Sequence, residues 1–260
     1  MASRAEIVAS NVLEECGITD PLQLPVDVIL NSKDLLIKEE EIDGAEGRIV
    51  MNETSGVITI NSKIQIPTKK RFVLAHELGH FELHRNKTKI YNDDDDTLNR
   101  WYDAKFAVEE TEANEFAAEF LMPSEIFHSE CKGKKFGPEV IDYLASRFQV
   151  SKTAAILKFA NRGNHPICIV YCKANRMKWW KKSDDFRYFL NFQRDHKPPG
   201  DSVAYEVFTT PNRYYDDEQK QNIWKSTWFE LKHDERDKPF YEFCLFASSY
   251  NYTLSVIWED

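Results

Sequence analysis

The segment Arg71–His84, RFVLAHELGHFELH, holds two histidines four residues apart, His76 and His80, with Glu77 directly after the first. Most other positions of this segment are apolar, which predicts a buried helix over about residues 68–84. Residues four apart project from one face of a helix, so both imidazoles can share one metal ion. Glu77 stands where a carboxylate can reach a metal-bound water without being a ligand. The pattern therefore predicts a zinc site that activates water.

A catalytic zinc ion usually takes a third protein ligand, and the sequence offers several. His84 lies four residues after the second histidine, but on a straight helix it has rotated away from the shared face. A second predicted helix, residues 108–121, carries five glutamates. Glu110 and Asn114 within it form an ExxAN pattern similar to that of glutamate zincins, in which an Asp or Asn orients a ligand histidine. We expect Glu110 to be the third ligand and Asn114 to support a histidine, with Glu112 as the alternative ligand.

The two segments together resemble the ImmA/IrrE family of metallopeptidases. RFVLAHELGHFELH is followed about thirty residues later by ETEANEFAAEFLMP, and residues 25–27 and 56–61 also resemble that family. The similarity spans roughly residues 1–163. It implies a minimal zincin domain with a helix-turn-helix-like appendage at about residues 138–162.

This resemblance also implies a chemistry and a partner. It places zinc on His76, His80 and Glu110 and makes Glu77 the general base. The implied activity is that of a zinc endopeptidase, a hydrolase that cleaves a helix-turn-helix transcriptional repressor. Cleavage would derepress stress-response, mobile-element or defence genes. The alternative is a non-proteolytic, zinc-stabilised regulator that binds and sequesters a repressor or DNA, although such a module has no need of Glu77.

Direct DNA binding is not expected. The segment 138–162 predicts two helices, 139–148 and 152–161, joined as in a helix-turn-helix. The second of them lacks the Arg-, Gln- and Asn-rich face of a helix that reads bases. The chain also has a formal charge of −9, whereas nucleic-acid-binding proteins usually carry a basic face.

The composition changes near Gly163, where we place a domain boundary. Residues 164–260 hold 21 of the 34 aromatic residues, and the formal charge is −8 before the boundary and −1 after it. The first domain, residues 1–163, is predicted to be the zinc peptidase. The second is predicted to be an aromatic-rich sensor or recognition domain, which binds a small molecule or a protein. The expected fold class for both is α+β.

Several short runs predict strands. Leu35–Ile37, Arg48–Met51 and Val57–Ile60 predict a small antiparallel sheet. Residues 57–61 are a candidate edge strand for a substrate peptide or, equally, an ordinary core strand. In the second domain, the predicted strands are 167–171, 202–208, 240–248 and 252–258, and 222–231 fits a helix or a strand. Trp179 and Trp180, flanked by lysines, fit a strand with buried tryptophans or a stacking surface. The candidate donors to the transition state are Tyr102, His84, Arg71 and Arg48.

The remaining features indicate a protein of the cytoplasm. The five cysteines are scattered and odd in number, and no two of them form a CxxC pair, which favours reduced thiols. The chain contains no apolar run long enough for a signal peptide or a membrane-spanning helix, so we expect no association with a membrane.

Overall fold

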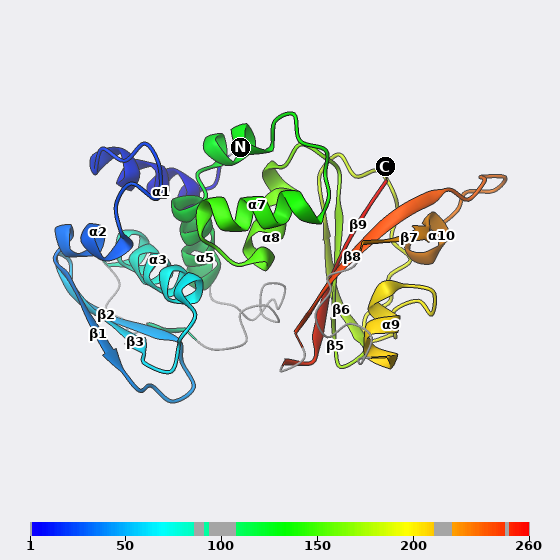
Figure 1. Ribbon diagram of the computed structural model, residues 1–260. Helices are drawn as coiled ribbons and strands as arrows, with labels where there is room; N and C mark the ends of the chain where they lie inside the picture. The colour runs from blue at the N-terminus through cyan, green and yellow to red at the C-terminus, as the bar shows by residue number, and fades with distance from the viewer. Residues whose placement is uncertain (1, 86–90, 94–107, 211–219, 248–249, 260) are drawn as a thin grey trace. The chain divides into compact units, whose positions relative to one another are not determined.

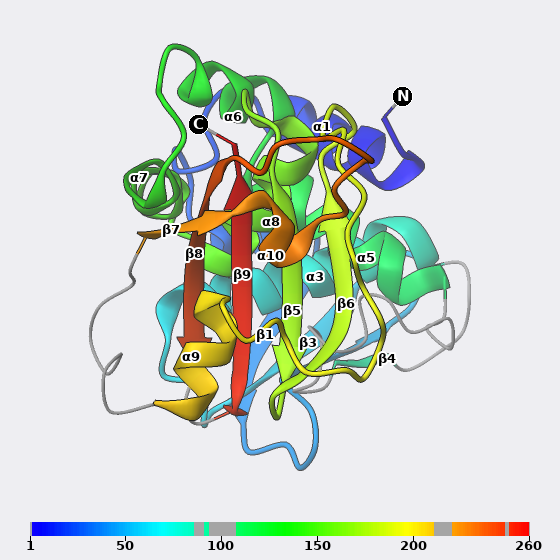
Figure 2. The same ribbon diagram turned by 90° about the vertical axis from the view of Figure 1, so that its right-hand side faces the viewer.

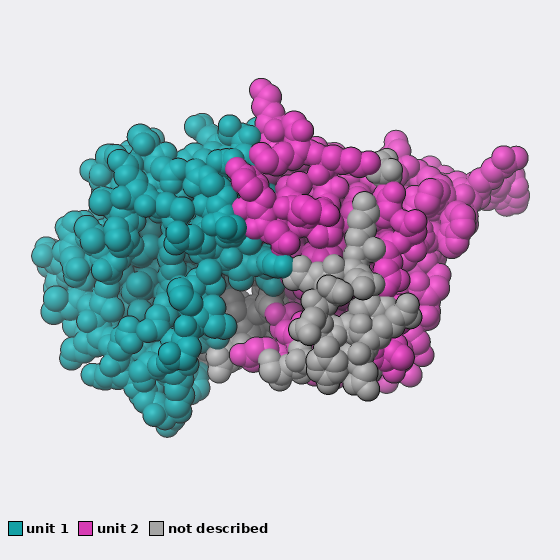
Figure 3. Space-filling model, viewed as in Figure 1, with its two compact units in different colours: residues 1–130, 144–154 teal, residues 131–143, 155–260 magenta. Residues whose placement is uncertain are grey.

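The structure is a computed structural model of the 260-residue chain, and it describes all residues except 1, 86–90, 94–107, 211–219, 248–249 and 260 (Figure 1). The fold is mixed α and β, as the sequence predicts. The chain forms two compact units, coloured separately in Figure 3: unit 1 comprises residues 1–130 and 144–154, and unit 2 comprises residues 131–143 and 155–260. The domain boundary expected near Gly163 stays a prediction.

Unit 1 contains a small sheet and the helices that carry the predicted zinc site. Its elements are α1 (Arg4–Glu15), α2 (Val26–Ser32), β1 (Leu35–Glu40), β2 (Gly47–Met51), β3 (Gly56–Asn61), α3 (Pro67–His84), β4 (Tyr91–Asp93), α5 (Val108–Leu121) and most of α6 (Ser124–Cys131). The strand order is β1-β3-β2-β4. The sheet is mixed and not antiparallel as expected, because β1 pairs with β3 in parallel.

The strand proposed as an edge for substrate is not an edge. β3, which contains residues 57–61, pairs with β1 on one side and β2 on the other, so its main-chain groups are already used. A run of four buried residues, Ile58–Asn61, fits this central place. The described edges of the sheet are β1 and β4.

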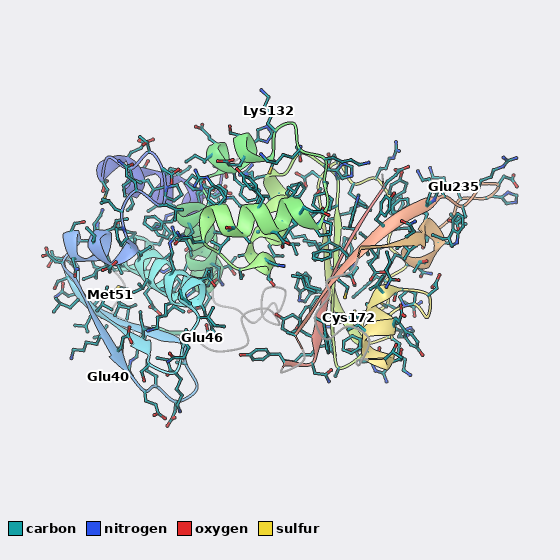
Figure 4. All side chains as sticks on the ribbon, viewed as in Figure 1. Glu40, Glu46, Met51, Lys132, Cys172 and Glu235 are labelled. Carbon is teal, nitrogen blue, oxygen red and sulfur yellow. The ribbon has the colours of Figure 1, made fainter. Side chains whose placement is uncertain are left out.

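Local sequence explains where the main helices of unit 1 begin. Ser3 and Glu6 form a capping box at the start of α1, because the Ser3 side chain accepts from the Glu6 amide and the Glu6 side chain accepts from the Ser3 amide. Pro67 opens α3, at a position where its missing N–H is not needed. α3 also packs on the sheet: Lys69 near its start forms an ion pair with Glu46, which precedes β2 and is labelled in Figure 4.

Two helices, α7 (Pro138–Phe148) and α8 (Lys152–Arg162), form the predicted helix-turn-helix-like pair. Their junction includes Gln149, which has a left-handed backbone (φ 51°), and Ser151, whose side chain accepts from the Ala154 amide. All residues from 155 to 160 are buried, so this part of α8 packs inside the protein. Both helices extend across the division between the units.

Unit 2 is built on a five-stranded antiparallel sheet with the order β6-β5-β9-β8-β7 (Figure 2). Its elements are β5 (Cys168–Lys173), β6 (Arg176–Lys182), α9 (Val203–Thr209), β7 (Lys220–Trp224), α10 (Lys225–Trp228), β8 (Pro239–Ala247) and β9 (Tyr252–Trp258). α9 packs against β8 and β9. The core beneath it includes Val203, Val207, Trp228, Phe240 and Cys172, the last labelled in Figure 4.

One strand prediction in this unit is wrong. Residues 202–208 are rich in apolar and aromatic side chains and include two valines, but all except the capping Ser202 belong to α9. Ser202 caps this helix, and the Glu242 carboxylate on β8 accepts hydrogen bonds from the Val203 and Ala204 amides at 3.0 and 3.1 Å. This partner lies about forty residues away, so the local pattern could not reveal it. The ambiguous stretch 222–231 contains the end of β7 and then α10.

The tryptophan pair, the cysteines and the helices agree with what the sequence predicts. Trp179 and Trp180 lie on β6; Trp179 is buried and stacks on Tyr171 with ring centroids 5.1 Å apart, whereas Trp180 is partly exposed. All five cysteines are free. None of the helices described is both long and apolar enough to cross a bilayer.

Candidate metal centre

Two helices of unit 1 carry the predicted site residues. α3 holds His76, Glu77 and His80, and each of these side chains is almost fully buried. α5 holds Glu110 and Asn114 and packs against α3. The structure thus brings together residues that are thirty or more positions apart in the sequence.

A glycine allows the two helices to approach closely. A β-carbon added to Gly79 would lie 3.1 Å from Phe116 Cδ1 and 3.2 Å from both the α-carbon and the carbonyl oxygen of Ala113. Such contacts are tighter than side chains normally make. Gly79 on α3 and Ala113 on α5 therefore set the short separation between the helices that the site needs.

Three side chains direct donor atoms at one point. His76 Nε2 and His80 Nε2 lie 3.0 Å apart. The Glu110 carboxylate faces both, with Oε2 3.3 Å from His76 Nε2 and Oε1 3.4 Å from His80 Nε2. Among the described residues, these three form a group of potential metal ligands whose donor atoms all lie within 4.8 Å of one another.

The donor set suits zinc. Bonds of about 2.0–2.1 Å in tetrahedral geometry place neighbouring donors about 3.3 Å apart, and the separations of 3.0–3.4 Å are close to that value. Asn114 Oδ1 lies 3.0 Å from His76 Nδ1 and can accept its proton. This contact leaves a lone pair on His76 Nε2, which points toward His80 and Glu110. Two imidazoles and a carboxylate are a usual protein ligand set for catalytic zinc.

The charge states of the donors agree with metal binding. Burial lowers the pKa of His80 to about 4, so this imidazole is neutral near pH 7. Burial would by itself raise the pKa of Glu110, but its hydrogen bonds to His76 and His80 outweigh this effect and hold the pKa well below its usual range. Near neutral pH, Glu110 is therefore a carboxylate and His80 a neutral base, which are the forms that bind a metal.

Glu77 lies against the sheet. A β-carbon added to Gly47 of β2 would lie 2.7 Å from Glu77 Oε1 and 2.5 Å from Val73 Cγ1. Only glycine fits at this position without displacing one of those side chains. Gly47 could not be found from the sequence, because nothing in the local pattern links a glycine at the start of a strand to a helix thirty residues later.

The structure places the alternative metal ligand and two of the candidate transition-state donors outside the group of three potential ligands. Glu112, the alternative ligand, contacts His84 and Arg4 and is not part of the three-residue group. Arg71 donates to the carbonyls of Pro21, Phe148 and Gln149. Arg48 follows Gly47 on β2, so its side chain leaves the opposite face of the sheet from Glu77. Tyr102 lies outside the described residues.

Comparisons with known proteins agree with these features. Residues 31–159 match the family described as the IrrE N-terminal-like domain, a peptidase family. A radiation response metalloprotease IrrE from Deinococcus deserti is 33% identical over 129 residues, which cover 47% of this chain and 42% of that protein. The protein of the same name from Deinococcus radiodurans is 33% identical over 123 residues, covering 45% and 34%. The alignment thus spans less than half the length of these relatives.

A solved structure shares the fold. A Mycobacterium tuberculosis transcriptional regulator superposes with a TM-score of 0.63 at 15% identity, covering 99% of this chain and 77% of that one. At this identity the likeness concerns the fold alone. Family assignment comes from the matched domain and the relatives that share it: the chain belongs to the ImmA/IrrE family through its IrrE N-terminal-like domain at residues 31–159.

Proposed function

We propose that this chain is a zinc-dependent endopeptidase that cleaves a specific partner protein. The observation that carries the proposal is the convergence of His76, His80 and Glu110 on one point, with buried Glu77 next to the first histidine. Related proteins are named metalloproteases, which supports the same chemistry.

In this proposal each residue has a distinct task. His76, His80 and Glu110 would hold the zinc ion. When bound, zinc lowers the pKa of a water molecule and polarises the scissile carbonyl. Glu77 accepts the proton of the attacking water and transfers it to the nitrogen of the departing amine. Asn114 holds the His76 ring by accepting its Nδ1 proton, which fixes the tautomer that binds metal.

The proposed substrate is a helix-turn-helix transcriptional repressor, and its cleavage would release stress-response, mobile-element or defence genes in the cytoplasm. This part depends on the family resemblance. Burial of α8 over residues 155–160 supports a protein partner over DNA, since a buried helix cannot enter a groove. Unit 2, with its own sheet and core, is proposed to recognise the substrate or a regulatory ligand.

The test uses the helix-turn-helix repressor encoded closest to this chain's gene. The zinc-loaded chain is incubated with the purified repressor, and fragments are identified by mass spectrometry. Glu77→Gln is the matched variant, because it is nearly isosteric and keeps all three donors. We expect cleavage at one site by the wild type and none by the variant or after chelation. Tight binding of the repressor without cleavage by either protein would instead favour the sequestering regulator.

A further inference from the structure

A third histidine continues the row of imidazoles on α3. His84 lies one turn beyond His80, and its Nδ1 is 3.2 Å from His80 Nδ1. The His84 side chain is completely buried. His80 therefore directs one ring nitrogen toward His76 and Glu110 and the other toward His84.

The row extends from His84 to two charged residues. His84 Nε2 lies 2.9 Å from Glu112 Oε2, and Glu112 Oε1 lies 3.2 Å from Arg4 Nη1. Arg4 also donates from Nη2 to the Leu83 carbonyl at 3.2 Å, which fixes its guanidinium beside the end of α3. Arg4 is the first residue of α1 and lies outside the family domain at residues 31–159.

The hydrogen-bonding roles in this row follow from one requirement. If His80 Nε2 is to offer a lone pair to zinc, its proton must be on Nδ1. That proton needs an acceptor, and His84 Nδ1 lies within hydrogen-bond distance at 3.2 Å. His84 must then carry its own proton on Nε2, which faces the Glu112 carboxylate. Each contact in the row has one donor and one acceptor, and a carboxylate paired with an arginine terminates it.

We infer that His84, Glu112 and Arg4 are positioning residues for His80: they hold its ring orientation and its zinc-binding tautomer through a hydrogen-bonded chain that begins on α1. This inference rests on the proposed zinc site. His84 takes for His80 the role that Asn114 takes for His76, and Glu112 orients His84. The metal site thereby depends on a helix outside residues 31–159, the range that matches the family domain.

The experiment compares zinc affinity in the full 260-residue chain. His84→Phe keeps a planar ring but removes the acceptor, whereas His84→Gln keeps an acceptor and a donor on one side chain. Glu112→Ala removes the next member, and Glu115→Ala is its matched control, a half-buried glutamate on the same helix. Zinc dissociation constants are measured by competition with a chromogenic chelator. Cobalt absorption spectra report the ligand geometry, and thermal unfolding of the metal-free proteins reports folding.

Loss of such supporting partners typically weakens metal binding by about 10–100-fold. We expect a loss in this range for His84→Phe, a smaller one for Glu112→Ala, and near wild-type affinity for His84→Gln and Glu115→Ala. The cobalt spectrum should change in His84→Phe and be restored in His84→Gln. If His84→Phe does not fold, the zinc affinity of Glu112→Ala tests the inference. The Glu112 side chain is 22% exposed, so its removal should disturb folding less than a change at the buried His84.

Two failures are distinguishable. A wild-type chain that binds no zinc would overturn the proposed function itself. A wild-type chain that binds one zinc tightly, with unchanged affinity and cobalt spectrum in His84→Phe and Glu112→Ala, would leave the zinc site intact and overturn only the inference.

Discussion

Glu77 and Gly47 are in contact across the interface between α3 and the sheet, with no room for a side chain on Gly47: its β-carbon would lie 2.7 Å from Glu77 Oε1. The residue proposed as general base is thus positioned by a strand that carries none of the metal donors. If Glu77 is the general base, the position of β2 affects proton transfer as well as folding.

The first prediction concerns this contact. Gly47→Ala should move the Glu77 carboxylate or Val73, and a displacement of about 1 Å can cost about 100-fold in rate. Zinc content should not change, because the atoms nearest to the added methyl belong to Val73 and Glu77 and not to a proposed metal donor. The measurement is kcat for partner cleavage together with zinc stoichiometry. Gly200→Ala is the control, since a β-carbon there meets nothing within 4 Å. Equal rates for both variants would contradict this positioning role.

The second prediction is one zinc ion per chain. His76→Ala removes one donor, and Glu110→Gln replaces a carboxylate with an amide, which is a poor zinc ligand, so both purified proteins should lose most of their metal. Glu115→Gln, on the same helix as Glu110, should retain it. Elemental analysis after dialysis decides this, and full occupancy in both His76→Ala and Glu110→Gln would exclude the proposed ligand set.

The third prediction separates the base from the ligands. Glu77→Gln should retain zinc and bind the partner, while cleavage falls by about 10²–10⁴-fold, the range that general acid–base catalysis contributes. The measurements are single-turnover cleavage and partner affinity on the same preparation. A variant that cleaves at close to the wild-type rate would show that another group takes the proton.

The fourth prediction concerns stability in unit 2. Glu242 is fully buried and accepts four hydrogen bonds, from the Val203 and Ala204 amides, from Trp228 Nε1 at 2.9 Å and from Ser255 Oγ at 2.6 Å. Glu242→Gln replaces one acceptor with an NH₂ group that faces donors. The unfolding free energy of this unit should fall by about 2–3 kcal/mol.

Urea denaturation followed by tryptophan fluorescence measures this change, because Trp228 contacts the mutated side chain. Glu230→Gln, an exposed change of the same type, is the control and should have little effect. A loss in Glu242→Gln no larger than in the control would show that the four contacts contribute little to stability.

The fifth prediction concerns truncation after residue 163. Phe136 packs against Phe159 with ring centroids 4.6 Å apart and against Trp258 at 4.9 Å. A chain that ends at residue 163 loses Trp258 and leaves both phenylalanines partly exposed. We expect limited proteolysis to cut this chain between residues 131 and 162 faster than it cuts the full chain, while the zinc donors remain present. Equal cleavage rates would support the boundary at Gly163.

Local sequence was informative where local forces determine structure. The apolar positions of residues 71–84 predicted the helix that became α3, and the four-residue spacing of His76 and His80 indicated a shared metal. The choice between Glu110 and Glu112 depends on how α5 packs on α3, so the sequence left both open. The close approach at Gly79 and Ala113 is what directs Glu110 to the histidine pair.

Contacts between residues far apart in the sequence account for the two wrong predictions of secondary structure, the antiparallel sheet of unit 1 and the strand at residues 202–208. The parallel pairing of β1 with β3 could not be seen from the alternation of either strand, which is the same in both kinds of sheet. Residues 202–208 become a helix because a buried carboxylate on β8 accepts from their amides. Arg4 and Gly47 join the surroundings of the site only through tertiary packing, which no local pattern reports.

Because the two units are interleaved along the chain, a ribosome supplies residues 131–143 of unit 2 before the last segment of unit 1, residues 144–154. His76, His80 and Glu110 all emerge before the first strand of the five-stranded sheet, so the nascent chain holds every metal donor early. Residues 131–143 follow next, but Trp258, against which Phe136 packs, is synthesised more than a hundred residues later. During that interval residues 144–154 are synthesised and can complete unit 1. Phe136 can pack against Trp258 only after the last strand has been made. Translation thus supplies the proposed metal donors before the strands that complete the core of unit 2.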